Sequence, residues 1–120
     1  MRKQMIAMSM AALLAGAAAP MQAAAKQVVG VIAGVDVHAP ATLQLTSRGR
    51  EAATVHTDGN TSFVKWVTHR PWQQNARVTT ESLLQGRCVD VEVSDSNVAK
   101  VVRVSDEPAG SVFDPCRDRR

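Results

Sequence analysis

The sequence contains no tyrosine, only two phenylalanines and two tryptophans, and only two cysteines. Its 120 residues suffice for one domain, and they are too few for a large cofactor-binding enzyme or a multi-domain machine. Common catalytic signatures are missing as well: there is no G-x-S-x-G, no S-x-x-K and no glycine-rich phosphate loop. We therefore expect neither an enzyme nor a cofactor.

A strong excess of positive charge is also missing. The formal net charge is +3, and it falls by two once Arg2 and Lys3 are assigned to an export signal. Proteins that bind single-stranded nucleic acids combine a cationic groove with aromatic rings on which the bases stack. With 3% aromatic residues and so small an excess of cations, the composition argues against nucleic acid as the partner.

The N-terminus has the parts of a secretory signal. A short positive start is followed by the uncharged apolar stretch 5–19, by Pro20, and by the small residues 23–25 that a signal peptidase requires. The stretch is too short for a membrane-spanning helix, and no cysteine follows it for lipid attachment. We predict a cleavable signal peptide at residues 1–25 and a periplasmic or secreted mature chain with no membrane span and no lipid anchor. An uncleaved anchor or a buried core helix is the alternative.

Cys88 and Cys116 are the two cysteines, and in an oxidising compartment an even number favours pairing. A disulfide between them would tie a polar, turn-rich tail, residues 106–120, to the domain at residues 26–105. The loop-entropy model gives about 3–4 kcal/mol for closing such a loop. Two free or metal-binding thiols are the alternative, although neither cysteine lies in a C-x-x-C or near a histidine.

Alternation of apolar and polar residues predicts strands after residue 26. One face of the first segment is predicted to carry Val29, Val31, Ala33, Val35 and Val37. Gly30 and Gly34 interrupt this segment, and glycine permits a bulge that bends a strand.

Four further strands are predicted at residues 42–46, 53–55, 88–93 and 98–104. In the strand at residues 88–93, the valines at 89, 91 and 93 are predicted to face inward, while Asp90 and Glu92 are predicted to face solvent. A short helical turn at residues 80–84 precedes that strand. The sequence thus predicts an all-β fold, a small five-stranded barrel that is closed or nearly closed.

Five stretches occur in a distinctive order: residues 29–35, 41–45, 58–63, 84–89 and 98–104, with a second cysteine in the tail. In this order and spacing they resemble an exported bacterial family of unknown function built on an OB-type five-stranded β-barrel. The resemblance spans residues 28–104. It implies a fold and an export route, and it brings no catalytic or binding residues with it.

The segment between the third and fourth predicted strands concentrates aromatic rings and cations. We predict a binding surface there for an unknown envelope protein or an extended polymer, formed by Lys65, Trp66, His69, Arg70 and Trp72. A glycan or a single strand of nucleic acid is a less favoured ligand. The alternative is an accessory domain without a ligand, in which Phe63 and Trp66 cover the open end of the barrel and Trp72 packs under the loop.

The remaining titratable residues carry weak signals. His38, His56 and His69 lie in separate segments, and a single pair such as His56 and Asp58 is a poor predictor of a metal site. Asp90 and Glu92 share a face, as paired catalytic acids do, but they also fit the solvated side of a strand. We expect a monomeric, non-catalytic binding or adaptor module without a metal.

Overall fold

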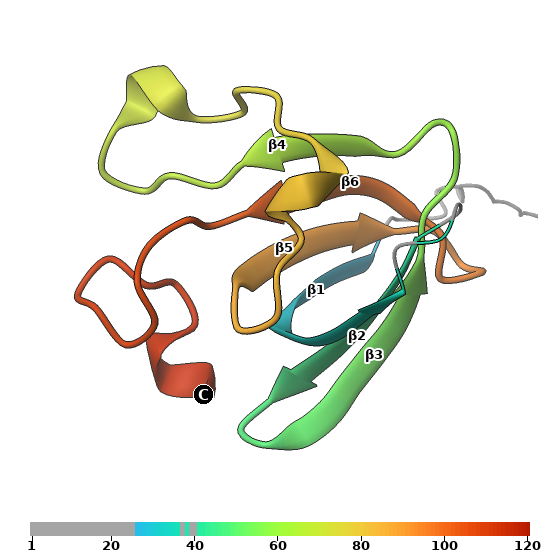
Figure 1. Ribbon diagram of the computed structural model, residues 1–120, viewed down its shortest axis with the longest axis horizontal. Coiled ribbons are helices and arrows are strands. Elements are labelled where there is room, and N and C mark those ends of the chain that lie inside the picture. Colours follow the sequence, from blue (N-terminus) through green and yellow to red (C-terminus); the bar gives the residue numbers. More distant parts are fainter. Residues whose placement is uncertain (1–25, 37, 39–40) are drawn as a thin grey trace, which may run out of the picture.

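The computed structural model describes residues 26–36, 38 and 41–120. Its strands, drawn in Figure 1, are β1 (Lys26–Asp36), β2 (Thr42–Ser47), β3 (Arg50–His56), β4 (Ser62–Lys65), β5 (Cys88–Val93) and β6 (Ala99–Val104). Three short 3-10 turns complete the regular structure of this part of the chain: η3 (Pro71–Gln73), η4 (Thr80–Ser82) and η5 (Arg117–Arg119). The all-β class is confirmed, and η4 confirms the helical turn predicted before Cys88. The signal peptide predicted at residues 1–25 lies outside the described residues.

The six strands form one mixed sheet in the order β3-β2-β1-β5-β6-β4. All neighbouring pairs are antiparallel except β4 and β6, which run parallel. The prediction of five strands in a closed or nearly closed barrel is therefore wrong: the sheet has a sixth strand and is open. The reason is that the turn after His56 ends the pairing with β2, and the chain then adds β4 to the opposite edge, beside β6.

A few contacts link β3, at one edge of the open sheet, to β6, which lies next to the other edge. The backbone N–H of His56, at the end of β3, donates to the carbonyl of Asn97 at 2.9 Å, and His56 forms a parallel bridge with Val98. Just after this point, Thr61 Oγ1 donates to the carbonyl of Ala99 at 2.7 Å. The end of β3 and the start of β6 are thus held together, although no continuous ladder joins β3 to β6 within the described residues.

The first strand contains the predicted bulge. Its register with β2 shifts between Ile32 and Gly34. The shift changes which side chains face inward, so the assignment of one continuous valine face was wrong: Ile32 is buried, whereas Ala33 is exposed. Gly30 allows β1 and β2 to approach closely, because a Cβ at this position would lie 2.9 Å from the carbonyl oxygen of Thr46.

The core lies on one face of the sheet. Its buried side chains are Ile32, Leu43, Leu45, Val55, Leu83, Val89, Val91, Val93, Ala99, Val102 and Val104. The inward orientation predicted for the three valines of β5 is confirmed, since each is at most 1% exposed. Burying a valine or leucine stabilises the fold by about 1.5–3 kcal/mol, so these strands carry most of the hydrophobic stabilisation.

Candidate functional site

The parallel pairing of β4 and β6 decides where the two longest irregular segments lie. The last residues of the two strands, Lys65 and Val104, are opposite one another in the register. The excursion that follows β4, residues 66–77, and the tail that follows β6, residues 105–120, therefore leave the sheet at the same end. Figure 1 shows both on the left of the view, beyond β4 and β6. The backbone N–H of Trp66 continues the contact by donating to the carbonyl of Val104 at 3.0 Å.

The excursion is a loop closed at its base and turned at its tip. At the base, the N–H of Lys65 donates to the carbonyl of Ala76 at 2.8 Å, and Val64 bridges to Arg77. Inside the loop, Gln74 Oε1 accepts the N–H of Val67 at 2.6 Å. These bonds hold the loop that carries the short turn η3 and Trp72, and η3 itself contains no buried residue.

The two tryptophans have different surroundings. Trp72 is 77% exposed, so the alternative in which it packs under the loop is wrong. Trp66 is half-buried at the start of the excursion. Phe63 is partly buried and packs against the core, which is compatible with its suggested position over the end of the strands. Of the predicted aromatic contact residues, Trp72 is the one that offers most of its ring to a partner.

Lys65, His69 and Arg70 of the predicted surface each lie opposite an acid at the start of the tail. Lys65 Nζ lies 3.7 Å from Asp106 Oδ2, whereas His69 Nδ1 and Arg70 Nη2 lie 3.5 and 3.6 Å from Glu107 Oε2. Partly exposed pairs of this kind contribute about 0–1 kcal/mol each. Their main consequence is electrostatic: the acids offset the positive charge that a phosphate backbone requires.

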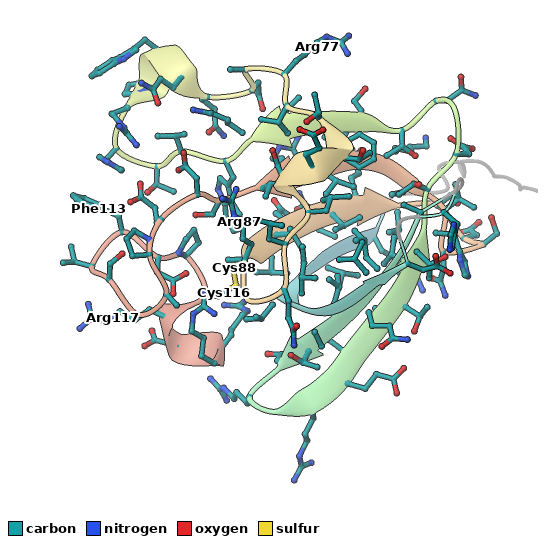
Figure 2. All side chains as sticks on the ribbon, in the orientation of Figure 1. Arg77, Arg87, Cys88, Phe113, Cys116 and Arg117 are labelled. Atoms are coloured by element: carbon teal, nitrogen blue, oxygen red, sulfur yellow. A yellow bond between two sulfur atoms is a disulfide. The ribbon has the colours of Figure 1, made fainter. Side chains whose placement is uncertain are left out.

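An aromatic stack joins the excursion to the tail. The rings of His69 and Phe113 are 3.8 Å apart between centroids and 12° from parallel. Phe113 remains 45% exposed and its neighbour Val112 is 72% exposed. Phe113 is labelled in Figure 2, on the outer side of the tail. We call the loop–tail face the surface made by His69, Arg70, Trp72, Glu107, Val112 and Phe113.

The tail is fastened by the predicted disulfide. Cys88, the first residue of β5, is bonded to Cys116, and their Cα atoms are 5.6 Å apart. Both cysteines are buried and neither is free, so the alternative of free or metal-binding thiols is wrong.

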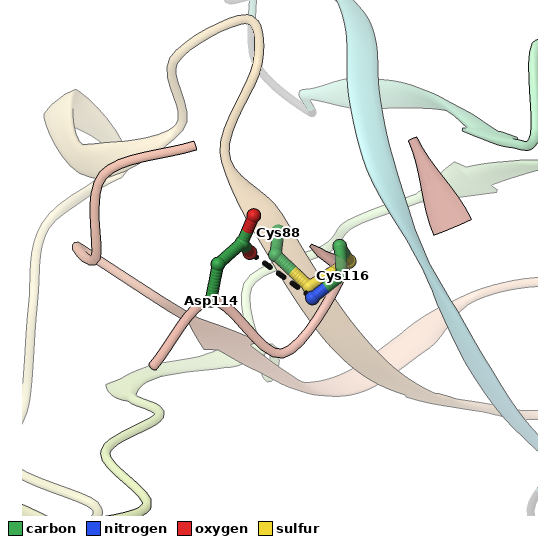
Figure 3. Close-up of side chains that lie close together, drawn as sticks. All are labelled: Cys88, Asp114 and Cys116. Carbon is green, nitrogen blue, oxygen red and sulfur yellow. Dashed lines mark hydrogen bonds between the residues drawn. A yellow bond between two sulfur atoms is a disulfide. The ribbon is translucent and has the colours of Figure 1, made fainter. Parts of the chain in front are cut away.

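Asp114 forms a second attachment beside the disulfide (Figure 3). Its side chain is fully buried and accepts hydrogen bonds from the N–H groups of Gly110 at 2.7 Å and Cys116 at 3.0 Å, and from Arg120 Nε at 2.6 Å. Burial by itself raises the pKa of Asp114, but the hydrogen bonds from Arg120 and the two N–H groups outweigh burial and hold the pKa below its ordinary value. Arg120 also donates to the carbonyl of Gly86 at 2.7 Å, which links this network to the segment before β5.

Potential metal ligands converge at one point in the described residues, where Cys88, Asp114 and Cys116 meet. The two sulfurs there are bonded to each other. His56 Nδ1 lies 3.3 Å from Thr42 Oγ1, and Asp58 Oδ1 accepts the N–H of Asn60. His56 and Asp58 thus have different hydrogen-bond partners and are not paired with each other.

The paired acids of β5 are half-buried. Asp90 Oδ2 lies 3.9 Å from Arg103 Nη1 on β6. Burial raises the pKa of Asp90, the Arg103 guanidinium opposes the rise, and the neighbouring Glu92 adds to it. Asp90 thus belongs to an ion pair between two strands.

Comparisons with known proteins add no relative: no family model, no curated protein and no solved structure matches this chain. Within the described residues, no helix has the length and apolar character needed to cross a membrane.

Proposed function

We propose that this chain is an exported, non-catalytic binding or adaptor module of the cell envelope, and that its loop–tail face contacts a partner protein. The observation that carries the proposal is the exposure of large apolar side chains on two segments that leave the sheet together. Trp72 is 77% exposed and Val112 is 72% exposed. Tryptophan and arginine are enriched among the residues that dominate binding energy at protein interfaces, and Arg70 precedes Trp72 by two positions.

The charge arrangement favours a protein over a nucleic acid. Arg70 of the face is already paired with Glu107, and Lys65 nearby is paired with Asp106, which reduces the attraction of these cations for phosphates. A protein interface instead combines an apolar centre with a polar rim whose charges are partly satisfied. An extended glycan, which also stacks on exposed aromatic rings, is the second ligand class that the test must separate.

Export is supported by the disulfide. Disulfides persist in oxidising compartments such as the bacterial periplasm and are rare in the cytosol. The bond between Cys88 and Cys116 therefore fits the secretory signal that the sequence predicts at residues 1–25. We propose a periplasmic or secreted location on these two grounds.

We also propose that the sheet is related to the OB fold, a five-stranded and partly open Greek-key barrel. The support is the pairing pattern, in which β1 lies between β2 and β5. If β3 and β4 are two pieces of one interrupted strand, that strand pairs first with β2 and then, in parallel, with β6. On the same basis we propose that the chain belongs to the exported family that its sequence resembles.

A non-catalytic role is proposed because the groups that could do chemistry have other partners. The two cysteines are bonded to each other, and Asp90 is paired with Arg103. The internal pairing of the cations also favours one competing function, an accessory domain without a ligand. In that case the stack of His69 on Phe113 serves only to hold the tail.

The experiment is an affinity recovery from solubilised envelope protein with the immobilised exported chain. We expect Trp72→Ser to lose the partner, because this change removes an exposed ring without opening the core. Leu84→Ser is the matched control, since Leu84 is 50% exposed and lies outside the loop–tail face. Equal recovery by the native chain and Trp72→Ser would contradict the proposal and favour the accessory domain. If no protein is recovered but the tryptophan fluorescence changes on titration with envelope glycans, the ligand would be a polymer and not a protein.

A further inference from the structure

The tail has almost no hydrophobic anchor of its own. Among residues 106–120, Asp114 and Cys116 are the two whose side chains are buried, whereas Val112 is 72% exposed and Phe113, stacked on His69, is 45% exposed. Two of its backbone hydrogen bonds close local turns, from Ser111 to Pro108 and from Asp114 to Ser111. Such a segment lacks the apolar burial that normally offsets the loss of chain entropy on ordering.

The tail is therefore held by a few polar links and one covalent bond. The links to the β2–β3 turn are donated by Arg48, to the carbonyls of Asp118 and Arg119. The acids near the start of the tail pair with the excursion at distances of 3.5 Å or more, beyond strong hydrogen bonds. The three donors of the Asp114 network all belong to the tail itself, and Arg120 links this network to the domain through the carbonyl of Gly86.

The tail also supplies half of the loop–tail face. Glu107, Val112 and Phe113 come from the tail, and Phe113 is the ring that covers His69. If the tail detaches, Trp72 remains on its loop, but the ring stacked on His69 and the acid that pairs with Arg70 are lost.

We propose that the disulfide assembles the loop–tail face, so that the chain becomes competent to bind its partner only after Cys88 and Cys116 have been oxidised. This inference rests on the proposed function and adds its redox control. Formation of the bond removes two protons and two electrons from the two thiols. A disulfide-carrying oxidant of the thiol–disulfide exchange class takes them up and leaves as a dithiol. In the reduced chain the sheet is formed and the tail is mobile.

The test compares the native chain with Cys88→Ala/Cys116→Ala by hydrogen exchange and mass spectrometry, without any ligand. We expect the amides of residues 106–120 to lose protection at least tenfold more than those of β5 and β6, which stay protected although loss of the cross-link lowers the free energy of unfolding. Unchanged protection of the tail would overturn the inference, because the polar links alone would then suffice. Loss of protection by the same factor in the tail and in the sheet would also overturn it, because the tail would then open only when the whole fold opens.

A second arm measures recovery of the partner from solubilised envelope protein. We expect the double variant to lose the partner at least tenfold, and Phe113→Ser, which keeps the disulfide, to weaken recovery while the tail stays protected. If Trp72→Ser loses the partner but the double variant keeps it, redox control is wrong and the proposed function stands. If the native chain recovers no more than Trp72→Ser, the proposed function fails, and redox control of it fails as well.

Discussion

Substitution of Asp114 by asparagine tests the second attachment of the tail. The carboxylate is fully buried and accepts three hydrogen bonds, from Gly110, Cys116 and Arg120. An asparagine keeps one oxygen acceptor and places an NH₂ group where the other oxygen was, facing donors. Hydrogen bonds to charged groups contribute about 1.5–3 kcal/mol, and at least one such bond is lost, so we expect Asp114→Asn to lower the free energy of unfolding by about 2–4 kcal/mol at pH 7.

The pH dependence gives the sharper form of this prediction. The pKa of Asp114 in the fold lies below its ordinary value of 3.8, so its ionised form stabilises the fold above that value, and the stabilisation is lost as pH falls through the folded pKa. The difference in the free energy of unfolding between the native chain and Asp114→Asn should thus be largest at pH 7 and should decrease as the pH is lowered below 3.8. Urea unfolding followed by tryptophan fluorescence measures it. A variant as stable as the native chain at pH 7, or a difference that acid leaves unchanged, would refute the reasoning.

Three further variants, one of them with a matched control, test the covalent link and the core. Cys88→Ala/Cys116→Ala should lower the free energy of urea unfolding by about 3–4 kcal/mol, because the bond closes a loop with a sequence separation of 28; a loss below 1 kcal/mol would contradict this. Gly30→Ala should lower it by about 1–3 kcal/mol, since its Cβ would meet the backbone of β2, whereas Gly59→Ala, with open space around it, should stay within about 0.5 kcal/mol. Val91→Ala should lower the unfolding free energy by about 2 kcal/mol through the cavity it leaves, and thermal melting that matches the native chain would show that β5 is not the centre of the core.

Local patterns in the sequence predicted the parts of the fold that depend on neighbours along the chain. The alternation of Val89, Val91 and Val93 gave the correct inward face, because β5 has no bulge along its contact with β1. In β1 the same reasoning failed, because the bulge between Ile32 and Gly34 shifts the phase of the alternation. The glycines indicated that a bulge was possible, but not which side chains it would turn outward.

Features that depend on pairing between distant segments could not be predicted. The strand β4 is four residues long, all of them half-buried, so it shows no alternation and is defined by its parallel pairing with β6. The same pairing places the excursion beside the tail. Sequence reasoning therefore singled out His69 and Arg70 on the excursion but not Glu107 and Phe113, which the structure places beside them. The one available signal was the pair of cysteines, which indicated that the tail returns to the domain without indicating what it contacts.

Site-specific photo-crosslinking tests most directly whether the excursion and the tail act as one surface. Benzoylphenylalanine placed at position 72 and, in a second chain, at position 112 should yield the same crosslinked species from the envelope. The same group at position 84 should not yield it. Different species from positions 72 and 112, or a species from 84 that matches both, would contradict a single contact surface built from these two segments.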